Sequence, residues 1–316
     1  MTCDECGYRF ILSPKLYKVG DRRMQKIIEG MDDKHFTIHQ LYAHYVNKYT
    51  KRSKRSRSTS LPILGVVYLA SLLFSAGNTE AMIIATVLFG IISVLVFLGG
   101  KPLATFQEVK DALSKWNQAK KIPTLIQGKP SFHRSTSQYQ ETDLFNYGVE
   151  AIIVVDRNIY VDLLVKNKFH TQYKALIVSA KLYPQYLEKQ LRNLISETSG
   201  LPILFLHDAN SKGVQTKEIF IKSVGLSLDN HHCIDLGLFP EHFQKLTPLK
   251  NLRNQIPERE WRLDCLQIKH IEAIFNRYIT ERAEKLAQDP DGTTEEGLQL
   301  FDNAILAADL IADDFG

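Results

Sequence analysis

Between residues 150 and 240 the sequence alternates short apolar runs with segments whose apolar residues recur at helical spacing. Continuous apolar strands that alternate with helices are typical of a parallel sheet covered by helices on both faces. The sequence therefore predicts an α/β domain in this region. The expected strands are 151–156, 175–180, 202–208 and 233–238, and the expected helices are 158–169, 186–198 and 218–226.

Two of the expected strands end in an aspartate, Asp156 in the first and Asp208 in the third, and Asn210 follows two residues later. Because ligands of parallel sheets bind beyond the carboxyl ends of the strands, we expect these side chains to lie near one another. Magnesium is commonly held by one or two carboxylates together with waters and phosphates, so they are candidate metal ligands. The alternative is that both aspartates cap helices or shape turns, and spacing alone favours that alternative.

Several motifs in the same region resemble those of a known family. The segments concerned are FHTQY (169–173), Lys181-x-Tyr183-Pro184, the D-A-x-x-x-G pattern from Asp208 to Gly213, and LGLFPEHF (236–243). In this order they resemble the Toprim domain of the topoisomerase VI A subunit, which the related meiotic double-strand-break proteins share. The resemblance covers residues 145–250 and implies a Toprim-like fold for them.

The resemblance also implies a set of site residues. In that family a glutamate ends the first strand and a DxD pair follows the third, and together they hold magnesium near the DNA phosphates. By position, the glutamate corresponds to Asp156 and the DxD pair to Asp208 and Asn210. A lysine after the second strand corresponds to Lys181, and the glycine after DxD corresponds to Gly213, where we expect a tight turn. The resemblance thus implies metal ligation by the first three residues and phosphate binding by the last two.

The sequence departs from the family in two respects. Asp156 is one methylene shorter than glutamate, and Asn210 lacks the charge of the second acid, so we expect a weakened metal site. The family's nucleophilic tyrosine belongs to a winged-helix domain ahead of Toprim, and neither Tyr139 nor Tyr147 lies in such a context. We therefore do not expect DNA cleavage by a tyrosine, and topoisomerase activity is not predicted.

Residues 61–100 contain a single charged residue, Glu80. Two apolar runs flank the segment GNTE, and a bilayer-spanning helix needs about 20 apolar residues. The block therefore predicts a two-helix transmembrane hairpin. The alternative, a buried soluble hairpin, is disfavoured because the runs are apolar on all helix faces.

Basic residues flank the apolar block on both sides and are absent from its turn, so the positive-inside rule predicts an integral membrane protein with both termini in the cytoplasm. Attraction of such a cluster to anionic lipid is worth about 1 kcal/mol per basic residue. The cluster could also bind nucleic acid, although the net charge of +4 does not by itself indicate that partner. The basic residues are Lys51, Arg52, Lys54, Arg55 and Arg57 before the block and Lys101 after it.

The four cysteines do not form the pattern of a secreted disulfide framework. Cys3 and Cys6 make a C-x2-C followed by glycine and an aromatic residue, which resembles the knuckle of a zinc ribbon. Structural Zn²⁺ needs four ligands, so two more would have to come from a second copy or from histidines. The alternative is an incomplete ribbon with free thiols. The candidate histidines are His35, His39 and His44.

These features divide the chain into five parts. They are an N-terminal cytoplasmic segment with CxxC (1–60), the transmembrane hairpin (61–100), an amphipathic helix and polar linker (101–144), the Toprim-like domain (145–250) and a helical C-terminal region (251–316). In the last part, apolar periodicity predicts one long amphipathic helix over 258–285, which packs on the domain or offers a surface to a partner.

The sequence predicts a membrane-anchored, divergent Toprim-like protein that acts as a non-catalytic binding or scaffold module on the cytoplasmic face. Its ligand would be phosphate-bearing or a nucleic acid, recognised through Asp156, Lys181 and Asp208. The alternative is a tethered, nuclease-like enzyme that uses Mg²⁺ for phosphodiester or phosphoryl transfer. Two-metal hydrolysis needs several carboxylates, and the loss of one at position 210 favours the first hypothesis. A third hypothesis is a structural component with protein partners in a membrane complex.

Overall fold

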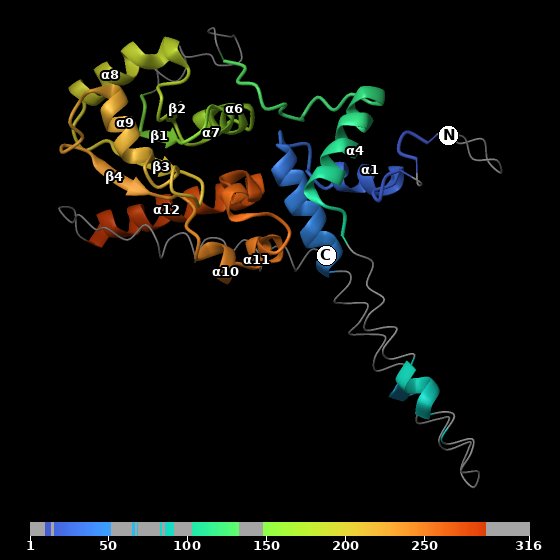
Figure 1. The fold of residues 1–316 in the computed structure, drawn as a ribbon. Helices are drawn as coiled ribbons and strands as arrows, with labels where there is room; N and C mark the ends of the chain where they lie inside the picture. The colour runs from blue at the N-terminus through green and yellow to red at the C-terminus, as the bar shows by residue number, and fades with distance from the viewer. Residues whose placement is uncertain are drawn as a thin grey trace. The chain divides into compact units, whose positions relative to one another are not determined.

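A computed structural model of the chain describes residues 10–13, 16–51, 103–132 and 148–288, with ten more between positions 65 and 91 (Figure 1). The chain forms two compact units. One unit comprises Met1–His44 and Phe106–Gly316, and the other comprises Tyr45–Thr105.

The first unit contains a four-stranded parallel sheet in the order β2-β1-β3-β4. The three strands β1 to β3 are buried along their whole length because each is a continuous apolar run, whereas the edge strand β4 is partly exposed. All four strands were expected from the sequence, and the structure confirms the parallel α/β architecture. Their bounds are β1 Ala151–Val155, β2 Ala175–Ser179, β3 Pro202–Leu206 and β4 His232–Asp235.

Helices connect the strands by crossovers, which are right-handed in nearly all parallel sheets. This rule puts the helices after β1 on one face of the sheet and those after β2 and β3 on the other, and Figure 1 shows α8 and α9 together, apart from α6 and α7. On the α7 side, Phe275 of α12 stacks on Tyr173 with ring centroids 5.0 Å apart. The helices are α6 Asn158–Lys166, α7 Phe169–Gln172, α8 Glu188–Glu197 (after the 3-10 helix η1 Gln185–Leu187) and α9 Thr216–Val224.

The C-terminal region differs from its expected form. The sequence predicts one helix over 258–285, but α12 begins only at Ile268 and extends to Gln288. The preceding residues form two short 3-10 helices. Their backbone makes hydrogen bonds to the loop after β3: Ala209 N donates to Trp261 O, and Leu263 N donates to the Asp208 carboxylate. Tertiary contacts therefore override helical periodicity here. The other elements are α10 His242–Lys245, α11 Thr247–Arg253, η2 Glu258–Glu260 and η3 Leu263–Cys265.

N-terminal residues pack in the same unit as the sheet. They include α1 Asp21–Glu29 and the beginning of a helix described over 38–51. His35 and Asn167 exchange two hydrogen bonds of 2.9 Å between backbone and amide. The amphipathic helix expected after the apolar block is present as α4 Phe106–Ala119. Residues ahead of and behind the apolar block therefore both belong to the unit that contains the sheet.

The polar linker expected within 101–144 is attached to the sheet domain at Ser131 and Phe132. Ser131 donates from its backbone and its hydroxyl to the buried carboxylate of Asp162, at 2.7 and 2.5 Å. The Tyr183 hydroxyl bonds the other oxygen of Asp162 and also accepts from Phe132 N. The start of this segment is thus fixed on α6, and residues 133–147 lie outside the described part of the chain.

Two of the expected features fall mainly on residues that the structure does not describe. Cys3 and Cys6 lie outside the described residues, as do most positions of 61–100. Within the described portion, no helix combines the length and the apolarity that a membrane crossing requires. The zinc site and the transmembrane hairpin therefore stay predictions.

Candidate functional site

The strand ends bring Asp156 and Asp208 together. They follow β1 and β3, which are adjacent and parallel, so both leave the sheet at the same edge. The backbone N–H of Asp208 donates to Asp156 Oδ2 at 3.2 Å. The sequence pattern alone gave this proximity as an expectation, and the structure brings the two residues into contact.

Asp208 is fully buried, and both of its carboxylate oxygens are occupied by donors from the same chain. Oδ1 accepts from the Tyr160 hydroxyl at 2.6 Å and from the Leu263 N–H at 2.8 Å. Oδ2 accepts from Arg157 Nε at 2.6 Å and, more weakly, from Asn210 Nδ2 at 3.4 Å. A buried charge is tolerated only when it is paired and hydrogen-bonded, and these four donors meet that demand.

Asp156 has the opposite environment. Its Oδ2 accepts the single bond from Asp208, while its Oδ1 is shielded from solvent and has no hydrogen-bond partner among the described residues. Burial, followed by the negative charge of Asp208, raises the pKa of Asp156 to about 7. A substantial share of the Asp156 side chains is therefore protonated and uncharged at neutral pH.

Asn210 and Gly213 shape the turn that follows β3. Asn210 Oδ1, the one oxygen that this side chain could give to a metal, accepts from the N–H groups of Lys212 at 3.1 Å and Gly213 at 3.0 Å. A Cβ on Gly213 would lie 2.1 Å from the Asp208 carbonyl oxygen, so the close approach of two backbone segments requires glycine. Both residues therefore shape the turn after β3.

Lys181 lies at the same edge of the sheet. It follows β2, the neighbour of β1, and Ala180 N continues the strand pairing by donating to Val155 O at 2.8 Å. The Lys181 side chain is exposed. The ends of β2, β1 and β3 thus carry Lys181, Asp156 and Asp208 in the spatial order of the strands.

Arg157 and Tyr160, which bind Asp208, were not identified from the sequence. Arg157 directly follows Asp156, and Tyr160 lies in the first turn of α6. The only available signal was their position just after a candidate ligand, because nothing local shows that either side chain turns toward β3.

A second pair at this edge was also missed. His207 Nδ1 faces the carbonyl oxygen of Asp208 at 2.8 Å, and Nε2 faces Asp235 Oδ1 at 3.1 Å. Burial lowers the pKa of His207, but the hydrogen bond and charge of Asp235 outweigh it, and the net pKa is raised. Each ring nitrogen thus faces an acceptor, an arrangement that favours the protonated form of the ring. Gly237 makes room for this ring, since a Cβ there would lie 2.3 Å from it.

A buried polar chain extends from Asp208 to the N-terminal part of the unit. The Tyr160 hydroxyl, which donates to Asp208, also lies 3.3 Å from Asp264 Oδ1, and His39 Nδ1 lies 3.3 Å from Asp264 Oδ2. His39 Nε2 faces Glu260 at 3.2 Å. Both ring nitrogens of His39 are therefore engaged, and in this arrangement His39 offers no lone pair to zinc.

The donor set at the strand ends does not match the magnesium centre that the resemblance implies. Asp208 is saturated by the protein, the Asn210 oxygen is held by the backbone, and only Asp156 Oδ1 remains open. Within the described residues, no group of three or more His, Cys, Asp or Glu side chains has a metal-binding arrangement. As arranged, the residues do not fit a divalent cation bound jointly by the three expected ligands.

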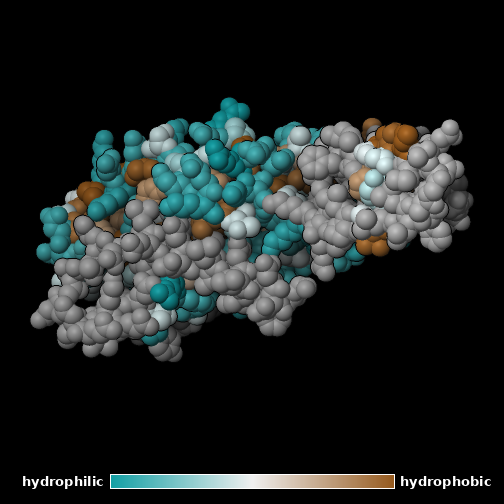
Figure 2. Space-filling model, turned by 90° about the horizontal axis from the view of Figure 1, so that it is seen from below, coloured by the Kyte–Doolittle hydropathy of each residue, from teal (hydrophilic) through white to brown (hydrophobic). Residues whose placement is uncertain are grey.

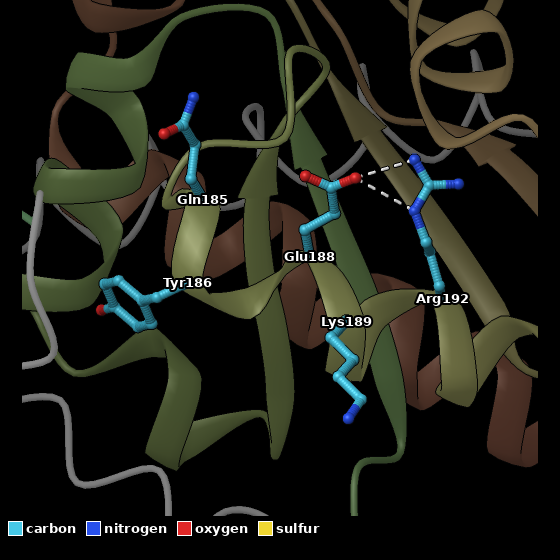
Figure 3. Close-up of a pocket in the computed structure, with 5 residues that line it drawn as sticks. All are labelled: Gln185, Tyr186, Glu188, Lys189 and Arg192. Carbon is cyan, nitrogen blue, oxygen red and sulfur yellow. Dashed lines mark hydrogen bonds and ion pairs between the residues drawn. The ribbon is translucent and has the colours of Figure 1, made fainter.

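A separate open cavity of about 360 Å³ lies over η1 and the start of α8 (Figure 3). Arg192 and Glu188 face one another there at 2.8 Å, so their charges largely cancel. None of the strand-end residues described above lines this cavity. Its lining residues are Gln185, Tyr186, Glu188, Lys189 and Arg192.

Comparison with known families agrees with the resemblance noted in the sequence. Residues 151–283 match the family model that describes the Toprim domain of Spo11 and the topoisomerase 6 A subunit. The match covers less than half of the 316 residues, and it ends within α12 instead of at residue 250. No curated protein and no solved structure matches the chain. The sheet and the family match together establish a Toprim-like domain in this part of the chain.

Proposed function

We propose that this protein is a membrane-anchored binding module whose Toprim-like domain holds a phosphate-bearing ligand at its strand ends without cleaving it. The observation that carries the proposal is the saturation of Asp208 by four donors of its own chain. Metal-assisted phosphodiester hydrolysis requires carboxylate oxygens free to hold the ions. Here both oxygens of the Asp208 carboxylate already accept hydrogen bonds from the protein.

The charges at the strand ends suit a phosphate. Arg157 is bound to Asp208 through Nε only, its side chain is 38% exposed, and its terminal nitrogens have no hydrogen-bond partner among the described residues. A guanidinium held in this way presents its remaining N–H donors in the fork geometry that matches phosphate oxygens. Lys181 adds a mobile point charge at the adjacent strand end.

Membrane anchoring is the second part of the proposal, and the described residues of the apolar block support it. Tyr68 and Phe89 stack with centroids 4.4 Å apart, and the Tyr68 hydroxyl lies 3.1 Å from Thr86 Oγ1, so described residues of the two runs lie side by side, which supports a hairpin. Apolar side chains of the two runs are exposed, and Figure 2 shows brown, hydrophobic surface at its right. Exposed apolar residues of this kind are suited to lipid. They are Val66, Ile83, Val87, Leu88 and Ile91, each more than half exposed.

The test of ligand binding uses the purified full chain in detergent micelles, a short fluorescent DNA duplex and inorganic pyrophosphate as competitor. We expect saturable binding that persists in EDTA, falls with added salt and is weakened several-fold in Lys181→Ala. Lys222→Ala is the matched control, because Lys222 is an exposed lysine in the last turn of α9, toward the opposite edge of the sheet. Absence of binding to both duplex and pyrophosphate would contradict the proposal.

The alternative function is a magnesium-dependent phosphodiester or phosphoryl-transfer enzyme. One observation favours it: the buried Asp156 Oδ1 has no hydrogen-bond partner among the described residues, as expected for a carboxylate that awaits a ligand. Incubation of the full chain with supercoiled plasmid and Mg²⁺ or Mn²⁺ separates the two functions. Cleavage that disappears in both Asp156→Asn and Asp208→Asn would establish the enzyme, and we expect none.

A further inference from the structure

The carboxylate of Asp208 raises a question of charge balance. It has no solvent exposure, and of its four donors only Arg157 carries a full positive charge. The other three are a tyrosine hydroxyl, a backbone amide and a carboxamide, which are neutral. Desolvating a carboxylate without a compensating charge costs several kcal/mol, so Arg157 is the group that makes a charged Asp208 tolerable in this position.

The position of Arg157 also bears on metal binding. Leu263 and Tyr160 donate to Asp208 Oδ1. Arg157 Nε lies 2.6 Å from the other carboxylate oxygen, Oδ2. A divalent cation of the magnesium type binds carboxylate oxygen at about 2.1 Å and needs a free lone pair, which the guanidinium already occupies. Two positive groups cannot share this oxygen at such distances without strong repulsion.

We propose that the Arg157 guanidinium occupies the place of a divalent cation beside Asp208, so that the strand-end site works without metal. The inference rests on the proposed function, because both take the strand ends as the ligand site. It adds that the positive charge that binds the ligand phosphate is the Arg157 side chain instead of a metal ion. Arg157 is placed there because it directly follows Asp156 at the end of β1. The Arg157 side chain then explains why the donors at the strand ends do not match a magnesium centre.

Removal of Arg157 is expected to restore a metal requirement. Arg157→Ala leaves Asp208 without its charge partner, and Mg²⁺ can then take the vacated lone pair of Asp208 Oδ2. We expect the full-length wild-type chain in detergent to show the same Tm in EDTA and in millimolar Mg²⁺. Arg157→Ala should unfold several degrees lower in EDTA and recover part of that loss with Mg²⁺. Mn²⁺ electron paramagnetic resonance should detect a bound ion in the variant alone.

Three further variants make the outcome interpretable. Arg157→Lys keeps a charge and should stay insensitive to metal. Arg157→Ala combined with Asp208→Asn removes both the cation and the demand for it, so it should fold without metal and gain nothing from Mg²⁺. Arg262→Ala removes a neighbouring arginine that pairs with Glu260, and it should create no Mn²⁺ site.

Saturable Mn²⁺ binding by the wild-type chain that is lost in Asp208→Asn would overturn the inference, as would an Arg157→Ala chain whose Tm and Mn²⁺ signal ignore metal. If Arg157→Ala does not fold, the wild-type titration and the double variant still decide the question. The proposed function fails separately: absent binding of duplex and pyrophosphate would remove the ligand while leaving the metal result intact.

Discussion

At the scale of single residues, Asp156 and Asp208 carry the same side chain at neighbouring strand ends and yet have different hydrogen-bond environments. Asp208 receives four donors, whereas Asp156 receives one and faces the charge of Asp208. The negative charge that the four donors stabilise on Asp208 therefore disfavours a negative charge on Asp156. This asymmetry predicts that neutralising Asp156 relieves repulsion in the folded state.

Asp156→Asn is expected to stabilise the fold at neutral and alkaline pH. Burial and the Asp208 charge raise the pKa of Asp156 to about 7, against 3.8 for an ordinary aspartate. Between these two values the folded state binds more protons than the unfolded state, so wild-type stability falls as pH rises through that window. The asparagine side chain does not titrate, so the variant does not lose stability in this window. Its free energy of unfolding should exceed that of the wild type by near zero at about pH 4 and by roughly 1–3 kcal/mol at about pH 8. Thermal unfolding of both chains across this range measures it.

Asp162→Asn is the contrasting variant. Asp162 is also buried, but it accepts from Ser131 and Tyr183, so an amide there turns a donor toward donors. It should lower stability by about 1–3 kcal/mol. A loss of stability in Asp156→Asn at about pH 8 would contradict the assigned raised pKa.

At the scale of elements, a buried pair between His39 and Asp264 connects the first turn of the helix that begins at residue 38 to the Toprim-like domain. Burial lowers the pKa of His39, but the charge and hydrogen bond of Asp264 outweigh it, and the net pKa is raised. Burial is the largest single influence on Asp264 and raises its pKa, but the charge and hydrogen bond of His39, the hydrogen bond of Thr37 and the charge of Arg262 together lower it. Each group therefore favours the charged form of the other, and the pair stabilises the packing of the helix over 38–51 against the η3 turn.

The pair predicts a pH-dependent coupling. A histidine with a raised folded pKa stabilises fully below its unfolded value near 6.5 and loses that contribution as pH rises through the raised value. A double-mutant cycle with His39→Gln and Asp264→Asn should give a coupling energy of about 1–3 kcal/mol at about pH 5.5, and less at about pH 8.5. Urea unfolding of the four chains provides the numbers. Equal coupling at the two pH values would show that the pair does not titrate as the geometry implies.

At the scale of the whole molecule, the proposed hairpin predicts where the chain resides and how it is oriented. The chain should sediment with membranes and resist alkaline extraction. In a chain whose four cysteines are replaced by serine, a cysteine at Asn78 should react with an impermeant thiol reagent in intact cells. A cysteine at Ser58 should react only after lysis, since the basic cluster keeps that end in the cytoplasm. Equal labelling at both positions, or release by alkaline extraction, would contradict the anchored topology.

Much of the fold follows from local pattern. The continuous apolar runs of β1 to β3 can be satisfied only in a sheet covered on both faces, and the helical spacing between them makes the sheet parallel. That geometry alone brings Asp156 and Asp208 to one edge, so their proximity was available from the sequence. The C-terminal helix over 258–285 was wrong in its first ten residues because helical periodicity does not reveal that Trp261 and Leu263 bond the strand-end loops.

Apolar periodicity and chain direction suffice to predict the strands, their parallel direction and the common edge at which Asp156 and Asp208 lie. The hydrogen-bond partners at this edge depend on the packing of distant segments. Tyr160, Leu263 and Arg157 lie 48, 55 and 51 positions from Asp208 along the chain, and no local pattern specifies that they converge on its two oxygens. Which lone pairs stay open depends on side-chain directions that are fixed by packing. For that reason, the arrangement of donors around Asp208 is visible only in the folded chain.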